Sequence, residues 1–165
     1  MIFGGLFKKV VIADARATAI VDPLFGDPMR HGALDAIVGL ASYAVVIYCD
    51  FSGYTDMAIG LALALGVHLP NNFLRPYAAR SIVDFWRRWH ITLSFWLRDY
   101  LYIGALGGNR GGKAREVRNV ILTMAIGGLW HGASWTFVVW GLFHGVGVAA
   151  AHLSGRVVVF APPAA

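Results

Sequence analysis

The amino-acid sequence predicts an all-helical integral membrane protein with a polar interior, on three observations. Hydrophobic residues make up 58% of the 165 residues and charged residues only 14%, whereas an ordinary soluble domain is about one quarter charged. The apolar residues lie in continuous blocks and do not alternate with polar ones, as they would in an outer-membrane barrel strand. Charges interrupt several blocks, and broken backbone at membrane depth survives only inside protein or beside water. We therefore predict a single membrane domain over residues 1–165.

Five apolar blocks are the candidate membrane helices. They cover residues 33–49, 57–67, 91–106, 119–130 and 133–153. A simple span needs roughly 20 apolar residues, and only the last block approaches that length. The others are short or contain charges such as Asp35, Arg98 and Asp99. We therefore expect several segments to be tilted, broken or re-entrant.

Two turns are predicted before the third apolar block. The loop DPLFGDPMRHG contains two aspartates and two prolines, which favour turns. A helix break is expected at DFSGYTD, where Asp50 and Asp56 can cap helix ends or line a cavity. No cleavable signal peptide is expected, because the positive charges of MIFGGLFKK follow its apolar stretch.

The stretch LRPYAARSIVDFWRRWHITLSFWLRDYLYI has the most informative polar pattern. Ser81 followed by Asp84 resembles a capping box, which predicts a helix that begins at Ile82 and extends to residue 97. Polar side chains recur at spacings of 3, 4 and 4 and would form one stripe: Arg87, His90, Ser94 and Arg98. Because a polar stripe in a membrane protein turns away from lipid, we expect His90 and Ser94 to face the protein interior.

The basic residues predict a membrane surface as the partner and no nucleic acid. The net charge is +5, but Lys and Arg lie between apolar blocks, as loop charges near anionic lipid do. Segments 75–88 and 109–118 are both rich in Arg and are separated by one block, 91–106. As a helix this block reaches about 24 Å, short of the roughly 30 Å hydrocarbon core. We therefore expect a re-entrant hairpin or buried helix, with both basic segments on the cytoplasmic side.

Two of the six histidines are candidates for chemistry. His131 follows Gly127–Gly128 and Trp130, where small residues allow close backbone approach and an indole can shield a cavity. An ionisable group there is a functional candidate, although a neutral imidazole can equally hydrogen-bond a neighbouring helix. His90 is the expected partner of His131, because His144 lies thirteen helical positions away, on roughly the opposite face. Such a pair predicts general-base activation of a hydroxyl.

Other chemistries find little support in the sequence. No spacing typical of zinc ligands, of a phosphate loop, of a dinucleotide-binding turn or of a nucleophile elbow is present, so we expect neither a metal site nor a cofactor. Cys49 is the single cysteine and cannot form an internal disulfide. A second function class stays open, a transport path in which His90 and His131 relay protons or pass a substrate without covalent chemistry.

The chain resembles the membrane-bound O-acyltransferase family in five motifs that occur in the family's order: YCDFSGYTDMAIGLALALG, LPNNFLRPY, FWRRWHITLSFWLRDYLYI, LGGNR and GLWHGASWTFVVWG. Within that family it resembles the bacterial alginate O-acetyltransferase membrane subunits and relatives that acylate wall polymers. The resemblance covers approximately residues 4–147.

The resemblance implies an integral-membrane O-acyltransferase whose helices surround a polar tunnel in the bacterial inner membrane, with several crossings. An acyl donor, acetyl-CoA or an acyl carrier, would enter from the cytoplasmic side. The acyl group, expected to be acetyl, would pass to hydroxyls of an exported polysaccharide or cell-wall polymer, directly or through an extracytoplasmic partner protein.

The resemblance also implies roles for individual residues. The catalytic histidines would be His131 of the WHG motif, as the base, and His90 of the WRRWH motif. The resemblance, the polar stripe and the indole before His131 together predict the substrate-binding residues. These are Arg87, Ser94, Asn71, Asn72 and Trp130.

Two departures from the family pattern stand beside these expectations. Family members are usually much longer, with helices before the GGLFKK segment and after the WHG helix, so the chain resembles a central fragment. An inactive fragment is therefore a third interpretation. Ala105 replaces a proline that relatives generally carry before Leu-Gly-Gly, which would loosen that turn without affecting the chemistry.

Overall fold

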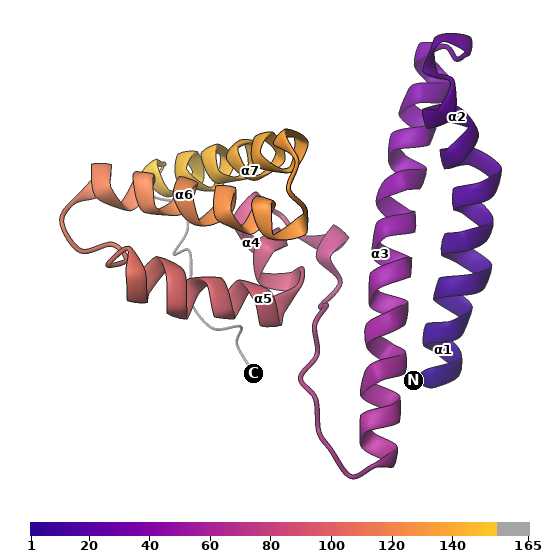
Figure 1. Cartoon of the computed structure of the whole chain (residues 1–165), viewed down its shortest axis with the longest axis horizontal. Helices are drawn as coiled ribbons and strands as arrows, with labels where there is room; N and C mark the ends of the chain where they lie inside the picture. Colours follow the sequence, from indigo (N-terminus) through magenta and orange to yellow (C-terminus); the bar gives the residue numbers. More distant parts are fainter. Residues whose placement is uncertain (155–165) are drawn as a thin grey trace. The chain divides into compact units, whose positions relative to one another are not determined.

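The computed structural model describes residues 1–154, and every regular element within them is a helix. This confirms the predicted all-helical class. The chain divides into two compact units, the first covering Met1–Asn71 and the second beginning at Asn72 (Figure 1). The expectation of one membrane domain over the whole chain stays a prediction.

The first unit is a helical hairpin built on one long helix. Short helical segments run back along this helix, and Gly5 and Gly53 lie where they approach it most closely, because a Cβ on either glycine would meet the backbone of the other. The elements are α1 (Ile2–Leu6), π-helices η1 (Phe7–Asp14) and η2 (Ala17–Val21), α2 (Asp22–Gly26), the 3-10 turn η3 (Pro28–Arg30) and α3 (Ala33–Ala64).

The predicted helix break at DFSGYTD is wrong, because α3 runs through this stretch without interruption. Its two aspartates bind lysines of η1: Lys9 Nζ lies 2.5 Å from the Asp50 carboxylate and Lys8 Nζ lies 2.7 Å from that of Asp56. Hydrogen bonds to Asp14 and Asp50 raise the pKa of Lys9. Opposite charges on a neighbouring helix therefore satisfy the two carboxylates, which need neither a helix end nor a cavity.

Among the described residues, two helices are long and apolar enough to cross a membrane, α3 and α7 (Trp135–Leu153). Only 17% of the most apolar stretch of α3 and 22% of that of α7 are buried, unlike the core helix of a soluble protein. At 1.5 Å per residue, α3 is about 48 Å long, more than the roughly 30 Å hydrocarbon core. Two blocks that are short in the sequence thus join into one long helix.

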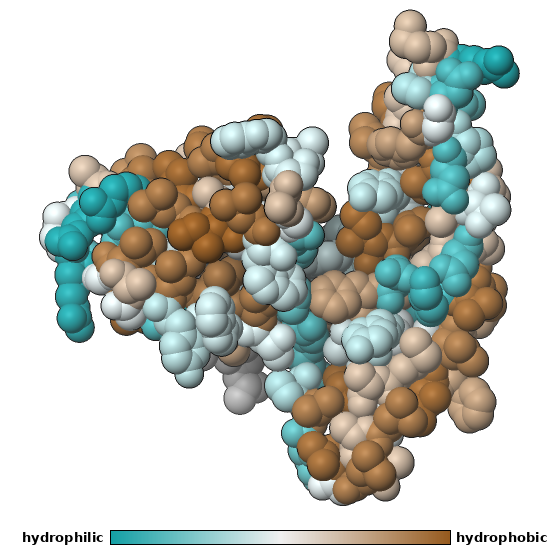
Figure 2. Space-filling view, in the orientation of Figure 1, coloured by the Kyte–Doolittle hydropathy of each residue, from teal (hydrophilic) through white to brown (hydrophobic). Residues whose placement is uncertain are grey.

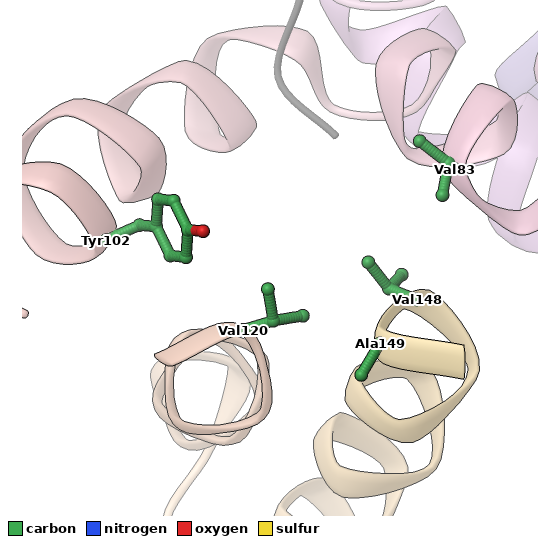
Figure 3. Packing of buried hydrophobic residues seen from close by; sticks show 5 residues of the cluster. All are labelled: Val83, Tyr102, Val120, Val148 and Ala149. Carbon is green, nitrogen blue, oxygen red and sulfur yellow. The ribbon is translucent and has the colours of Figure 1, made fainter. Parts of the chain in front are cut away.

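The second unit packs its helices around a small apolar core (Figure 3). Its elements are η4 (Pro76–Ala78), α4 (Ile82–Arg88), α5 (Ile91–Trp96), the π-helix η5 (Leu97–Ala105), α6 (Lys113–His131) and α7. The buried cluster comes from α4, η5, α6 and α7 and contains Val83, Tyr102, Val120, Val148 and Ala149. Hydrophobic residues cover most of the visible face of α6 and α7, whereas hydrophilic ones lie at the loop before α6 (Figure 2).

Glycines allow α6 and α7 to lie directly against each other (Figure 1). A Cβ at Gly128 would collide with the Phe137 carbonyl oxygen, and one at Gly141 would collide with the backbone of Met124. A Cβ at Gly145 would also meet α6, 3.0 Å from the Ile121 Cα. The small-xxx-small pattern of GLFHG therefore packs helices, as the sequence predicts.

The polar stretch 82–97 forms two helices and not the single one predicted. α4 begins at Ile82 as expected, where the Ser81 hydroxyl accepts the Asp84 N–H at 3.1 Å. It ends at Arg88, and His90 adopts a left-handed backbone (φ 45°, ψ 55°) before α5 begins. Helical spacing therefore does not hold across the break.

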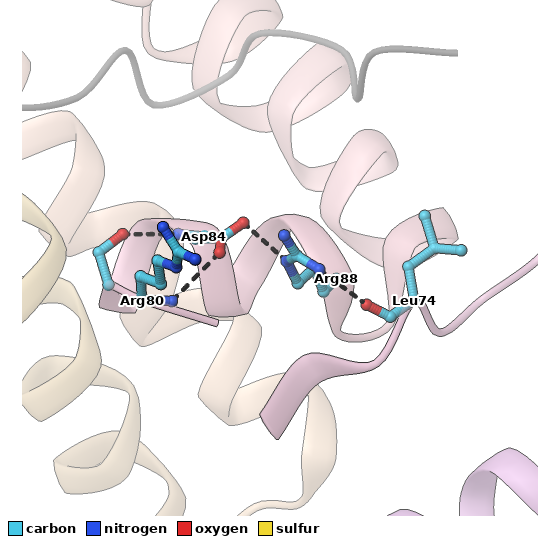
Figure 4. Close-up of polar contacts among 5 residues, drawn as sticks. Leu74, Arg80, Asp84 and Arg88 are labelled. Atoms are coloured by element: carbon cyan, nitrogen blue, oxygen red, sulfur yellow. Dashed lines mark hydrogen bonds and ion pairs between the residues drawn. The ribbon is translucent and has the colours of Figure 1, made fainter. Parts of the chain in front are cut away.

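An ion pair runs along the exposed side of α4 (Figure 4). Arg88 Nε donates to Asp84 Oδ1 at 2.7 Å, and the Arg80 backbone N–H donates to Oδ2 at 3.2 Å. Arg88 Nη1 also reaches the Leu74 carbonyl oxygen at 3.5 Å. The hydrogen bond from Arg88 lowers the pKa of the Asp84 carboxyl, so the carboxylate near the start of the helix stays ionised at neutral pH.

We expect the two basic segments to face the same side of the membrane, because α5 and η5 together extend only about 23 Å. In a Cys49→Ser background, cysteines at the exposed positions Ala78 and Asn109 should react with a membrane-impermeant maleimide from one side only. A permeant maleimide controls for reactivity. Labelling of the two cysteines from opposite sides would show that residues 91–105 cross the bilayer.

Acid should weaken α4 through Asp84. Its folded-state pKa is lowered, so the ion pair stabilises the fold above the unfolded pKa of about 4 and this contribution is lost as pH falls through the folded value. For a partly exposed i,i+4 pair we expect about 0.5 kcal/mol or less. Urea unfolding in detergent between pH 7 and 3 should show a smaller pH dependence for Asp84→Asn than for the unchanged protein. Equal pH dependence would exclude this ion pair as a source.

Candidate functional site

A cavity in the second unit brings His90 and His131 to one place. It lies between α4, α5, η5, α6 and α7, and about 70 Å³ is open to the centres of water molecules. Most of its walls are apolar. The polar side chains among its lining residues are Arg87, His90, Ser94, Thr123 and His131.

His90 reaches the cavity because the chain breaks there. Its left-handed backbone turns the chain between α4 and α5, and hydrogen bonds from the segment before α4 hold both sides of the turn. Leu74 N donates to the Arg88 carbonyl at 2.9 Å, and Ile91 N donates to the Asn72 carbonyl at 3.0 Å. A non-glycine residue persists in this conformation only where its surroundings determine it, and such residues are common at functional sites.

The side chain of Asn72 also contacts the turn. Its Oδ1 lies 3.3 Å from His90 Nδ1 and accepts hydrogen bonds from the Thr92 backbone N–H at 3.2 Å and the Thr92 hydroxyl at 3.0 Å. Asn72 is only 8% exposed. Asn71, the other asparagine of the motif, is exposed at the end of the first unit.

His131 is the last residue of α6 and lies against aromatic rings. Its ring centroid is 5.1 Å from that of Trp130, 6.1 Å from that of Phe137 and 5.5 Å from that of Trp140. Trp130 is itself 61% exposed and lies 6.0 Å from the His90 ring. The expected shielding indole is therefore beside both histidines, although it does not line the cavity.

His144 was expected on the opposite face of the same helix as His131, but the two histidines lie on different helices, α6 and α7. The helix breaks after His131, and α7 folds back along α6, so both histidine rings contact the indole of Trp140. Trp140 lies 5.5 Å from the His131 ring and 4.7 Å from the His144 ring. His144 also packs edge-on against Trp86 at 5.2 Å. Positions thirteen residues apart lie on opposite faces only where one helix continues between them, and here the helix ends at His131.

The polar stripe predicted on α4 and α5 reaches the cavity only in part. Arg87, His90 and Ser94 are half-buried and line it, as expected. Arg98 does not line it. It binds Asp99, with Nε 2.6 Å from Oδ1, and lies over a neighbouring phenylalanine ring. The break at His90 and the wider turns of η5 change the helical register that would have aligned Arg98 with the stripe.

Among the residues that line the cavity, two buried donors have no hydrogen-bond partner in the described part of the chain. They are Arg87 Nε and Trp86 Nε1, and both residues line the cavity. The Ser94 hydroxyl, in contrast, donates to the carbonyls of Trp86 and Trp89 at 3.4 and 3.3 Å. The Ser94 hydroxyl therefore links α5 to α4, whereas the buried N–H groups of Arg87 and Trp86 are not used within the described residues.

Burial keeps both cavity histidines neutral. Both lie outside the two candidate membrane spans. Desolvation, with a smaller contribution from His131, lowers the pKa of His90 to about 4, and desolvation also lowers the pKa of His131. At neutral pH each ring therefore has one unprotonated nitrogen that can accept a proton. Within residues 1–154, no group of three or more His, Cys, Asp or Glu side chains is arranged to hold a metal ion.

Sequence reasoning missed two tryptophans: Trp140 contacts the rings of His131 and His144, and Trp86 contacts the ring of His144. Trp86 and Trp140 lie 5.6 Å apart, on α4 and α7, and both line the cavity. An aromatic residue in an apolar segment is more often an interfacial or core side chain. Their position beside the histidines depends on the fold of α7 against α6 and α4, for which the sequence contains no local signal.

Comparison with known proteins identifies relatives over most of the chain. The model of the membrane-bound O-acyltransferase family matches residues 16–163. The chain is 55% identical over 147 residues to the probable alginate O-acetylase AlgI of Azotobacter vinelandii, which covers 88% of the chain and 28% of that protein. It is 52% identical over 145 residues to the peptidoglycan O-acetyltransferase of Helicobacter pylori, covering 88% and 27%.

A more distant relative is the teichoic acid D-alanyltransferase of Streptococcus thermophilus. It is 30% identical over 153 residues, which covers 87% of this chain and 37% of that protein. The chain therefore spans between 27% and 37% of the length of these three relatives.

Proposed function

This chain belongs to the membrane-bound O-acyltransferase family, and on that premise we propose that it contains the acyl-transfer site of an integral-membrane O-acyltransferase. The acyl group is acetyl, and the acceptor is a hydroxyl of an exported polysaccharide or cell-wall polymer. The observation that supports this most directly is the single cavity that His90 and His131 share with the unpartnered Nε of Arg87.

In the proposed reaction His131 is the general base. Its unprotonated ring nitrogen takes the proton of the acceptor hydroxyl while the hydroxyl oxygen bonds to the carbonyl carbon of the acyl donor. With a thioester donor, acetyl-CoA or an acyl carrier, the C–S bond then breaks, and the proton passes from the imidazolium to the departing thiolate. His131 thus ends the cycle neutral, in the state that burial favours.

Negative charge develops on the carbonyl oxygen during this attack, and the cavity contains groups that can stabilise it. Arg87 Nε and Trp86 Nε1 are buried donors without partners in the described residues. A preorganised donor aimed at such an oxygen contributes about 10²- to 10³-fold to the rate. His90 is the second catalytic histidine of the proposal, beside the reacting groups, and Asn72 supports it.

The size of the cavity favours a short acyl group. A water molecule needs roughly 10–15 Å³ of the same measure of space, so the 70 Å³ present corresponds to a few small groups and not to a long acyl chain. Tryptophan rings at 86, 89 and 140 surround this space. Exclusion of water by these rings would strengthen every electrostatic interaction inside the cavity.

The proposal places this cavity in a multi-pass protein of the bacterial inner membrane. α3 and α7 would cross the bilayer, and the helices of the complete protein would surround a polar tunnel. The acyl donor would enter from the cytoplasmic side, and the polysaccharide or an extracytoplasmic partner protein would receive the acyl group on the other. The exposed apolar faces of α3 and α7 support the lipid contact.

The roles of the two histidines that contact Trp140 can be separated by substitution. In the complete protein we expect His131→Ala to lower acyl transfer by about 10²- to 10⁴-fold, the usual contribution of a general base. His144→Ala should retain transfer and lower thermal stability, because this ring packs against Trp86 and Trp140. Polymer acetylation would be measured for both variants at matched protein levels in membranes.

Near-normal acetylation by His131→Ala would contradict the proposal. If substrate also moved across the membrane without an acetylated product, a transport path through the cavity would explain the two histidines better.

A further inference from the structure

We propose that Asn72 is a positioning residue that holds His90 in the tautomer with its proton on Nδ1, which makes Nε2 the nitrogen that accepts a proton. The structural part of this inference depends only on the contacts of Asn72. Its catalytic consequence rests on the proposed acyl transfer.

The first step is the orientation of the Asn72 amide. The backbone N–H of Thr92 lies 3.2 Å from Oδ1, and a backbone N–H can only donate. The atom that faces it must therefore be the amide oxygen, because an NH₂ group in that position would place two donors against each other. The Thr92 hydroxyl, 3.0 Å from the same oxygen, adds a second donor. A backbone group thus determines which way this amide points.

The second step is the protonation of the histidine ring. The oxygen that Thr92 orients also lies 3.3 Å from His90 Nδ1. Amide oxygens only accept hydrogen bonds, so Nδ1 must carry the hydrogen in this contact. A neutral imidazole has one N–H, and Nε2 is then left with its lone pair. The low pKa of His90, about 4, keeps the ring neutral at pH 7, so that the position of its single proton matters.

The third step is the stiffness of the support. Asn72 is 8% exposed, and its own carbonyl accepts the N–H of Ile91 at 3.0 Å, directly after His90. The main chain of Asn72 therefore binds Ile91, and its side chain binds both Thr92 and the His90 ring. This double attachment explains how His90 keeps a left-handed backbone, which is rare for a residue with a side chain. Ring direction and ring proton are set by the same neighbour.

The tautomer can be measured by NMR on the complete protein in lipid vesicles, with ¹³C- and ¹⁵N-labelled histidine. The His90 signals are assigned by their loss in His90→Gln. We expect ring shifts that place the proton on Nδ1 in the unchanged protein, and a shift of the proton to Nε2, or a mixture, in Asn72→Leu. A proton on Nε2 in the unchanged protein, or an unaltered tautomer in Asn72→Leu, would overturn the inference.

Asn72→Asp is the conservative variant and covers the case in which Asn72→Leu does not fold. A carboxylate accepts hydrogen bonds only, so the proton should stay on Nδ1, while the added negative charge should raise the pKa of His90. A pH titration of the His90 ring signals reports this rise, and an unchanged pKa would contradict the contact. Asn109→Asp and Asn109→Leu, at an exposed asparagine, are matched controls that should alter neither quantity.

Acetylation measurements separate this inference from the proposed function. We expect Asn72→Leu to lower transfer about 10- to 100-fold, the loss seen when a partner that orients a metal-binding histidine is removed, and Asn72→Asp to restore part of it. If Asn72→Leu moves the proton but His131→Ala remains active, the tautomer assignment stands and the acyl-transfer proposal fails. If His131→Ala is inactive and Asn72→Leu lowers only thermal stability, Asn72 supports the fold alone and the inference fails.

Discussion

The turn at His90 is the constraint on which the candidate site depends. Without it, α4 and α5 would continue as one helix. His90 and Arg98 would then lie on the same polar stripe of that helix, as the sequence predicts. Two backbone hydrogen bonds interrupt the helix on both sides of the turn, because Leu74 N donates to the Arg88 carbonyl and the Asn72 carbonyl accepts the Ile91 N–H. Because the interruption lies between Arg87 and Ser94, it brings three polar side chains of that stripe to one cavity and leaves Arg98 outside.

The part of the site formed by α6 and α7 depends on glycines at the contact between these two helices. Gly128, Gly141 and Gly145 let α7 lie directly on α6, where a Cβ at any of them would meet the opposite helix. The same fold-back brings Trp140 into contact with the rings of both His131 and His144. One indole thus contacts a histidine that lines the cavity and a histidine that does not. Small residues on one helix pair therefore allow the close packing that brings both imidazoles against Trp140.

Charges in this apolar chain are arranged in two different ways. Asp50, Asp56 and Asp84 each bind a lysine or arginine within 2.7 Å, and the first two do so on a helix long enough to span a membrane. Arg87, in contrast, keeps a buried Nε without a partner among the described residues, at the cavity. A buried donor left unpaired costs free energy, and functional sites are where proteins retain such costs. The contrast distinguishes structural charges from the one that faces the proposed substrate.

The sequence by itself determined the features that depend on composition or on close neighbours. These are the all-helical class, the start of α4 at Ile82, the glycine packing around His144, and the choice of His90 and His131 as candidates. Only the tertiary structure decided that α3 is continuous, that the stretch 82–97 is broken, and that Trp140 joins two histidines expected on opposite faces. Periodicity predicts faces only while a helix continues, and whether it continues depends on distant partners. Lys8 and Lys9 neutralise aspartates 41 or more residues away, and Asn72 reaches a histidine 18 residues away.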